Sequence, residues 1–265
     1  MMVDQDSWHA QTMALSDLVD AYEHTIRATL VMAADLSPQR WMLPTWLPGW
    51  NVADNVAHIA ALEHQFLGED VSGHALRTFE HVSTPLQEHM ERGIDVRRGW
   101  TQARIIDDLA TALSARLAIL RDPALTDDSL LPGLTGGERP AKSVLPIRVF
   151  DCWAHEQDIR AAVGLPGNLD SPAAGVSYEQ MSRAAGAVAA AAELGEGAAV
   201  NIVVTGPLPS TFTIGSGVAL ATITTDGLGI FRLMAGRGPW ADVAVSVAGD
   251  AALAERVLAS MAITP

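Results

Sequence analysis

The sequence predicts an α+β protein in which a four-helix bundle precedes a smaller domain of helices and strands. Apolar residues recur at helical spacing in several long segments of residues 1–172. Beyond that point, short runs rich in Val, Ile and Thr alternate with turn residues, which is typical of strands. We therefore expect a helical domain at residues 1–172 and an α+β domain at residues 173–265.

The first long helix is expected over residues 7–35. Its apolar stripe has the spacing of one helical face and consists of Leu15, Leu18, Val19, Tyr22, Ile26 and Leu30. Three prolines then interrupt the helical pattern: Pro38, Pro44 and Pro48. The segment LPTWLPGW, with two Trp and two Pro, is expected to be an ordered loop.

The second helix is expected over residues 52–67. Asn51 is a good N-cap residue, and Asp54 three positions later completes an approximate capping box. This helix contains His58, which apolar residues follow one turn later. An imidazole on an apolar face is usually a partly buried residue with one hydrogen bond, so His58 alone is a weak signal.

Two further long helices complete the predicted bundle. A polar helix is expected at 85–98 and a strongly periodic one at 101–121. Residues 122–142 are rich in Pro, Gly and Asp and are expected to form a loop. The last helix runs through Asp151 and His155 and ends at Gly164. Four principal helices joined in this way favour an antiparallel bundle.

The second domain begins with an Ala-rich helix expected at 178–193. Four runs then have strand character, and they are VNIVVTG, STFTIG, ALATITTDG and DVAVSVAGD. Short helices are expected at 229–239, within the strand region, and at 253–262.

Composition excludes several classes of protein. With 31 acidic and 17 basic residues the net charge is −14, which argues against nucleic acid and anionic membranes as partners. The one cysteine excludes an intrachain disulfide. No basic-flanked apolar leader or membrane-length apolar run is present, so we expect a cytoplasmic protein acting on small molecules.

Asp151, His155 and His58 are the candidate metal ligands. Asp151 and His155 are four residues apart, which places them on one helical face. A His from a second helix, His58, completes a set of two imidazoles and one carboxylate. Three such ligands with a fourth position open are typical of catalytic divalent-metal sites, most often zinc.

Other polar residues of the helical domain are expected to have supporting or structural roles. Asp158, three residues after His155, is either a ligand or a carboxylate that accepts a hydrogen bond from an imidazole N–H. Cys152 is expected to be a small core residue rather than a nucleophile. Four other histidines lie in polar or loop-like stretches and are expected to be solvated, namely His64, His74, His81 and His89.

Two segments resemble the mycothiol-dependent maleylpyruvate isomerase family, among the DinB-like metal-binding helical bundles. The first is a Pro-Gly-Trp turn followed by V-x-D-x-x-A-H-x-A, matched by Pro48, Gly49, Trp50, Val52, Asp54, Ala57 and His58. The second is a carboxylate, three residues, His and Asp-hydrophobic-Arg, matched by Asp151, His155, Asp158, Ile159 and Arg160. The C-terminal end resembles the sterol-carrier-like domain that often follows in this family.

The resemblance implies His58, Asp151 and His155 as ligands of zinc or a similar divalent ion, and mycothiol as co-substrate. The best-known members have Glu where this chain has Asp151. Asp is one methylene shorter, so the metal lies nearer the helix or the site has weakened. The resemblance also gives the bundle and the sterol-carrier-like domain as the two parts of the fold.

The predicted enzyme is an S-transferase or cis–trans isomerase acting on a small electrophile, as a monomer or homodimer. Arg237 and Asp158 are the predicted catalytic residues, with Arg237 holding a substrate carboxylate. Trp50 is predicted to line the mouth of the site and contact the thiol. Two alternatives stay open: a non-catalytic protein that binds a small ligand, and a metal-assisted hydrolase.

Overall fold

The computed structural model describes residues 13–134 and 136–263 and separates the chain into two compact units. The helical unit is Ala14–Gly167, and the sheet unit begins at Asn168. This arrangement of a helical part and a small sheet part confirms the predicted α+β class. The boundary predicted between residues 172 and 173 stays a prediction. Residues 7–12, where the first helix is predicted to begin, lie outside the described residues.

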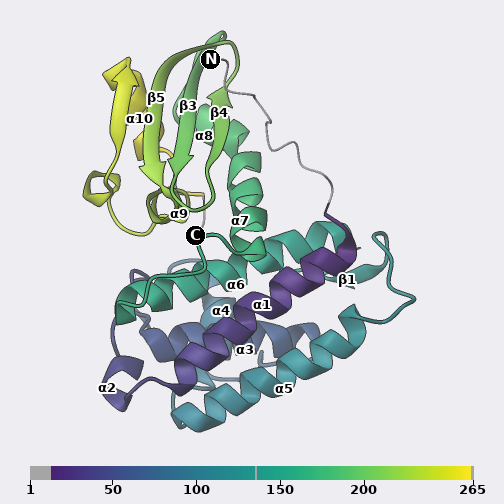
Figure 1. The fold of residues 1–265 in the computed structure, drawn as a ribbon. Coiled ribbons are helices and arrows are strands. Elements are labelled where there is room, and N and C mark those ends of the chain that lie inside the picture. The colour runs from purple at the N-terminus through teal and green to yellow at the C-terminus, as the bar shows by residue number, and fades with distance from the viewer. Residues whose placement is uncertain (1–12, 135, 264–265) are drawn as a thin grey trace. The chain divides into compact units, whose positions relative to one another are not determined.

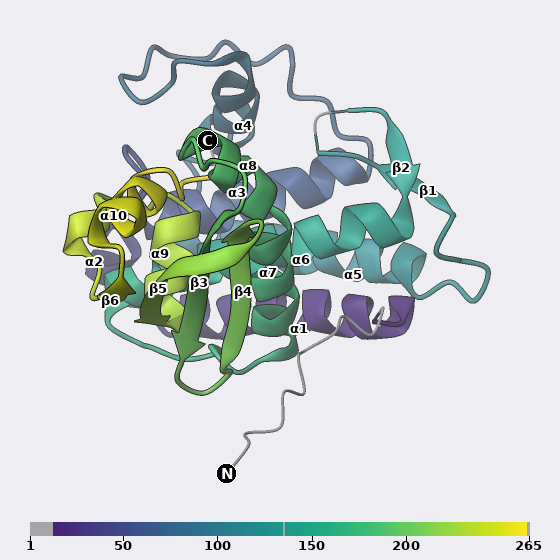
Figure 2. The same cartoon turned by 90° about the horizontal axis from the view of Figure 1, so that it is seen from above.

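Four long helices form the bundle of the helical unit (Figures 1 and 2). They are α1 (Leu15–Ala34), α3 (Val52–Phe66), α5 (Gln102–Leu120) and α6 (Ala141–Val163), and two short helices, α2 (Pro38–Trp41) and α4 (Pro85–Asp95), lie in the connections. Both α1 and α3 pack against α5 and α6. Their buried faces are apolar and include Tyr22, Ile26, Ile59, Leu109, Leu145 and Trp153.

Neighbouring helices of the bundle are not all antiparallel. Arg121, after the end of α5, donates to Asp20 near the start of α1 at 2.6 Å, so these two helices are antiparallel. By contrast, Arg116 and Glu63 pair near the C-terminal ends of α5 and α3. The long connection through α4 carries the chain back along the bundle before α5 begins, so α3 and α5 run the same way. A short connection would have made them antiparallel.

The turn before α3 fixes where that helix begins. Gly49 has a φ of +78°, and a Cβ there would lie 2.1 Å from His81 Nδ1, so the turn requires glycine. The predicted capping box is confirmed: Asp54 N–H donates to Asn51 Oδ1 at 2.9 Å, and Asn51 N–H donates to Asp54 Oδ2 at 3.0 Å. The cap and the turn together set the direction in which His58 projects.

Residues 122–142, predicted as a loop, contain a short hairpin of β1 (Leu130–Pro132) and β2 (Glu138–Pro140). Helix α6 begins directly after it at Ala141. The helix ends as predicted at Gly164, which adopts the left-handed conformation with φ of +62°. The hairpin therefore lies at the N-terminal end of the helix that carries Asp151 and His155.

The sheet unit contains four strands in the order β4-β3-β5-β6. The strands are β3 (Ala198–Thr205), β4 (Ser210–Gly215), β5 (Val218–Asp226) and β6 (Ser246–Gly249), and the helical elements are α7 (Pro172–Arg183), α8 (Ala185–Ala191), α9 (Gly227–Met234), η1 (Trp240–Asp242) and α10 (Ala251–Ala259). Only β3 and β5, among these strands, pair in parallel. Helices α8, α9 and α10 pack against the sheet.

The single helix predicted at 178–193 is wrong. The helix is interrupted at Ala184, whose N–H donates to Met181 O three residues back. Helix α7 therefore ends before Ala184, and α8 begins as a separate helix after it. Alanine-rich composition favours helix throughout but does not specify such a tightened turn. None of the helices in the described part of the chain is both long enough and apolar enough to cross a membrane.

Candidate metal centre

His58, Asp151 and His155 converge inside the helical unit. One ligand atom from each lies within 4.8 Å of the other two. His58 Nε2 is 3.6 Å from Asp151 Oδ2, and His155 Nε2 is 3.5 Å from Asp151 Oδ1. His58 comes from α3 and the other two from α6, so the packing of these two helices against each other assembles the group.

The donor set suits a divalent metal ion. Ligand atoms arranged tetrahedrally around zinc at ordinary bond lengths lie roughly 3.4 Å apart. The distance from each imidazole Nε2 to the nearer Asp151 oxygen is close to that spacing, although the two histidines approach different oxygens of the carboxylate. Both histidines are buried, whereas the Asp151 side chain is 23% exposed, so the group opens to one side at the carboxylate.

Asn55 and Asp158 lie on the far side of the His155 ring. His155 Nδ1 is 2.9 Å from Asn55 Oδ1 and 3.5 Å from Asp158 Oδ2. An amide oxygen only accepts, so Nδ1 carries the proton and donates to Asn55. The lone pair of Nε2 is then directed to Asp151 and the proposed metal position. Asp158 contacts Nδ1 and is outside the three-residue group.

The two imidazoles differ in their protonation. Burial, followed by the charge of His155, lowers the pKa of His58 to about 4. Burial also opposes protonation of His155, but hydrogen bonds with Asp151 and Asp158 raise its pKa above the usual value. His58 is therefore a neutral ligand at neutral pH, whereas His155 loses its proton at a higher pH.

A buried network of arginines and carboxylates supports Asp151. Arg148, one helical turn before Asp151, donates to its carboxylate and to Glu63 Oε1, the latter at 2.7 Å. Arg116 donates to the other oxygen of Glu63 at 3.2 Å. Burial opposes the ionisation of Asp151, but the Arg148 guanidinium holds the pKa of that carboxyl well below its usual range. Asp151 is therefore ionised, and the buried guanidinium of Arg148 holds its carboxylate in place.

A cavity of about 370 Å³ borders the open side of the group. Asp151 and Arg148 form part of its wall, and the hairpin and Phe66 form other parts. Its volume is within the range of small-molecule sites. Asp151 thus connects the group of candidate ligands to a space that a substrate can enter.

Residues 5–160 match the family model of the mycothiol maleylpyruvate isomerase N-terminal domain. The chain belongs to this family. Membership identifies it as an enzyme of the isomerase or transferase type, as the sequence predicts. None of the curated proteins searched matches significantly.

Two solved structures share the fold of this family member. One is the crystal structure of the mycothiol-dependent maleylpyruvate isomerase, with 17% identity and a TM-score of 0.58, covering 90% of this chain and 95% of the other. The second is a histidine-to-alanine mutant of that isomerase, with 16% identity and a TM-score of 0.56, covering 88% and 93%. At these identities the likeness shows the fold alone.

Trp50 of the family's Pro-Gly-Trp turn packs against the metal-ligand candidates. Its ring centroid lies 5.0 Å from that of His58 and 5.7 Å from that of His155. Its indole Nε1 donates to Glu91 Oε2 at 3.0 Å, which holds the ring in place. Trp50 therefore forms a wall of the site, and its predicted contact with the thiol stays a prediction.

The expectation that four histidines are solvated is wrong for three of them. His64 pairs with Asp108, and His74 with Asp95, each at 2.9 Å, while His81 pairs with Glu91 at 3.1 Å. These carboxylates lie on other segments of the chain, so local polarity could not reveal them. His89 is exposed, as expected, and contacts Gln65.

Cys152 and Arg237 are both buried. Cys152 has no solvent exposure and burial raises the pKa of its thiol well above the usual value, so it is the predicted core residue. Arg237, in the sheet unit, donates to Ala235 O at 2.7 Å and lies over the Phe231 ring. Its predicted contact with a substrate carboxylate stays a prediction.

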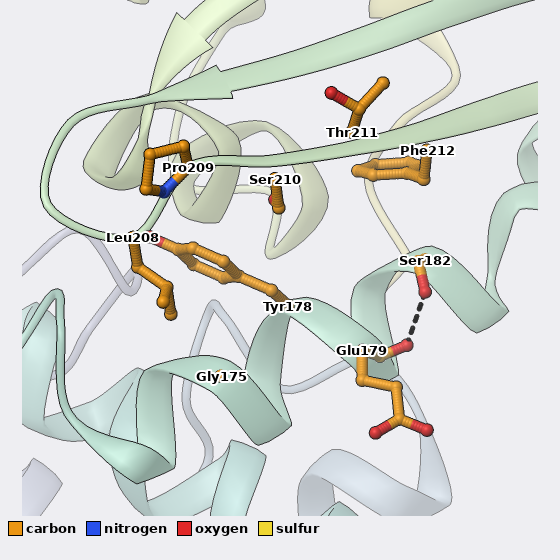
Figure 3. A pocket seen from close by; sticks show the side chains of 9 residues that line it. All are labelled: Gly175, Tyr178, Glu179, Ser182, Leu208, Pro209, Ser210, Thr211 and Phe212. Atoms are coloured by element: carbon orange, nitrogen blue, oxygen red, sulfur yellow. Dashed lines mark hydrogen bonds between the residues drawn. The ribbon is translucent and has the colours of Figure 1, made fainter. Parts of the chain in front are cut away.

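The sheet unit has a smaller cavity of about 90 Å³ (Figure 3). Tyr178 and Glu179 of α7 line it with residues of β4 and of the loop that precedes this strand. It is smaller than the ~150 Å³ cavity that holds benzene in an engineered protein. The described residues that line this cavity include no group of metal ligands, so the site in the helical unit is the better candidate for the functional site.

Asn55, Arg148 and Glu63 also contact the candidate ligands or their supports, although the sequence motifs do not include them. Asn55 is three residues before His58, and Arg148 is three before Asp151, so each shares a helical face with a candidate ligand. That spacing was an available signal. Glu63 carries no such signal, because its two partners come from α5 and α6.

Proposed function

We propose that this protein is a metal-dependent enzyme that uses mycothiol to convert a small electrophile, as a cis–trans isomerase of the maleylpyruvate type or as an S-transferase. The observation that carries the proposal is the convergence of His58, Asp151 and His155 beside a cavity of substrate size. Family membership supports the thiol dependence. A bound divalent ion would lower the pKa of a coordinating thiol and supply thiolate at neutral pH.

The side chains divide the work. His58 and His155 each offer an imidazole Nε2, and Asp151 supplies an anionic oxygen. Asn55 orients His155, with Asp158 on the same side of the ring, and Arg148 holds the Asp151 carboxylate. Trp50 excludes water from one side of the two imidazoles.

Either reaction begins with addition of the thiol sulfur to an unsaturated carbon of the substrate. Expulsion of the thiol after rotation about the former double bond gives isomerisation. If the thiol is retained and the neighbouring carbon takes up a proton, the thioether adduct is an S-transfer product. We also propose that Arg237 holds a substrate carboxylate and that the two domains meet between residues 172 and 173. The protein is proposed to act as a monomer or a homodimer.

The test combines metal analysis with turnover. We expect about one zinc per chain in the wild type, and His155→Ala to lose both metal and mycothiol-dependent turnover of maleylpyruvate. His89→Ala, on the exposed face of α4, is the matched control and keeps both. Full turnover in metal-free His155→Ala would contradict the proposal, and hydrolysis of esters without thiol would favour the hydrolase alternative.

A further inference from the structure

The cavity beside Asp151 has an apolar side and a charged side. Phe66, Val144 and Ile147 form the apolar side. Ile147 is 49% exposed, a large exposure for an isoleucine on the helix that carries the metal-ligand candidates. Two arginines, Arg139 and Arg148, line the cavity with them.

The two arginines differ in what they already bind. Arg148 is 3% exposed, and its guanidinium donates to Glu63, Asp151 and the Ile59 carbonyl. Arg139 is exposed, and its guanidinium donates to the Glu138 carbonyl at 3.2 Å. No carboxylate of the described residues lies within ion-pair distance of Arg139, although acids outnumber bases 31 to 17 in the chain. Its positive charge is therefore available to a ligand.

The hairpin gives Arg139 a defined position. Arg139 pairs with Leu131 across the two strands, and the Gly133 N–H donates to Gly137 O at 2.8 Å beyond them. A Cβ at Gly133 or at Gly137 would lie 3.7 Å from the Arg139 side chain, which is an ordinary contact distance, so both glycines lie beside that side chain. Helix α6 begins two residues after Arg139, which ties the hairpin to the helix of Asp151.

We infer that Arg139 determines specificity by binding the carboxylate of a small substrate whose apolar body lies against Phe66, Val144 and Ile147. A guanidinium forms paired hydrogen bonds with a carboxylate, and such bonds are stronger than neutral ones. The apolar wall selects the body, and the reacting end faces Asp151. The position of the reacting end rests on the proposed function, whereas the contact with Arg139 does not.

The experiment compares two probes of the same shape, trans-cinnamate and cinnamamide, by calorimetric titration of the zinc-loaded full chain. We expect the wild type to bind cinnamate about tenfold more tightly, in keeping with one charge-assisted contact. Arg139→Gln should abolish this preference and Arg139→Lys should retain part of it. Arg27→Gln, an exposed arginine of α1, is the matched control and should behave like the wild type.

Metal content of each sample separates this inference from the proposed function. Arg139→Gln with unchanged zinc and no preference for cinnamate supports the inference. A wild type without zinc that still prefers cinnamate through Arg139 supports the inference while the proposed function fails. Equal binding of the two probes to the wild type, or an unchanged preference in Arg139→Gln, overturns it.

Discussion

Asn55 Oδ1 and His155 Nδ1 lie 2.9 Å apart in the interior of the bundle and join α3 to α6. The two residues are 100 positions apart in sequence, and both are buried. Because Asn55 can only accept at this atom, it selects the His155 tautomer whose Nε2 is free to bind a metal. One amide thus links the packing of two helices to the chemistry of the site.

Changing Asn55 to Ala should weaken zinc binding about 10- to 100-fold, which is typical when the partner of a metal-bound histidine is lost. Competition with a chromophoric chelator measures this affinity. Asn55 also donates to Thr45 Oγ1 at 3.2 Å. Thr45→Val therefore serves as a control that loses this bond, and those of Thr45 Oγ1 with Trp50 O and Leu47 N–H, but keeps the contact of Asn55 with His155. Equal zinc affinity in the two variants would contradict the assigned role.

Changing Glu63 to Gln should lower the free energy of unfolding by about 3–5 kcal/mol, because it leaves two buried guanidinium groups short of an anion. Urea denaturation measures the loss. Glu23→Gln is a matched control, since Glu23 also pairs with two arginines, Arg27 and Arg121, but near the surface. There we expect a change of at most about 1 kcal/mol. Similar losses in both variants would exclude a special role for the buried network.

Zinc affinity should fall as the pH is lowered. Protons compete with the metal at Nε2 of each histidine, and only the neutral imidazole binds. The raised pKa of His155 means that this competition begins above pH 6.5, whereas His58, with a pKa of about 4, contributes only near pH 4. Zinc titrations from pH 8 to pH 5 measure the dependence. A constant affinity down to pH 6 would contradict it.

Changing Gly49 to Ala should destabilise the protein more than changing Gly68 to Ala. Both glycines have positive φ, +78° and +95°, so both substitutions strain the backbone by about 1 kcal/mol. A Cβ at Gly49 also collides with the His81 ring, whereas Gly68 has open space around it. Urea denaturation of the two variants measures the difference, and equal losses would show that the turn adapts.

The three metal-ligand candidates could be predicted from sequence because Asp151 and His155 share one helix and each ligand helix has local signals of its own. The spacing of Asp151 and His155 and the cap before His58 set the direction of each side chain. Packing of α3 on α6 then needed only to bring two helical faces together. The pattern of apolar residues identified those faces.

Features that depend on distant partners could not be predicted in the same way. The carboxylates that pair with His64 and His74 lie on α5 and α4, and nothing near either histidine in sequence indicates them. The sequence predicts a loop for the hairpin that carries Arg139, because residues 122–142 are rich in Pro, Gly and Asp. The two strands have only three residues each, and each contains a proline. Short strands of this kind give no periodic signal.

The burial of Cys152 has a practical consequence for assays. The chain has one cysteine, and that thiol has no exposed surface and is kept protonated by its surroundings. A disulfide reagent added to the folded protein should therefore react with the added thiol alone. Consumption of thiol in such an assay would report S-transfer, whereas isomerisation regenerates the thiol and would leave its amount unchanged. Loss of the native fold would appear as the reactivity of one further thiol per chain.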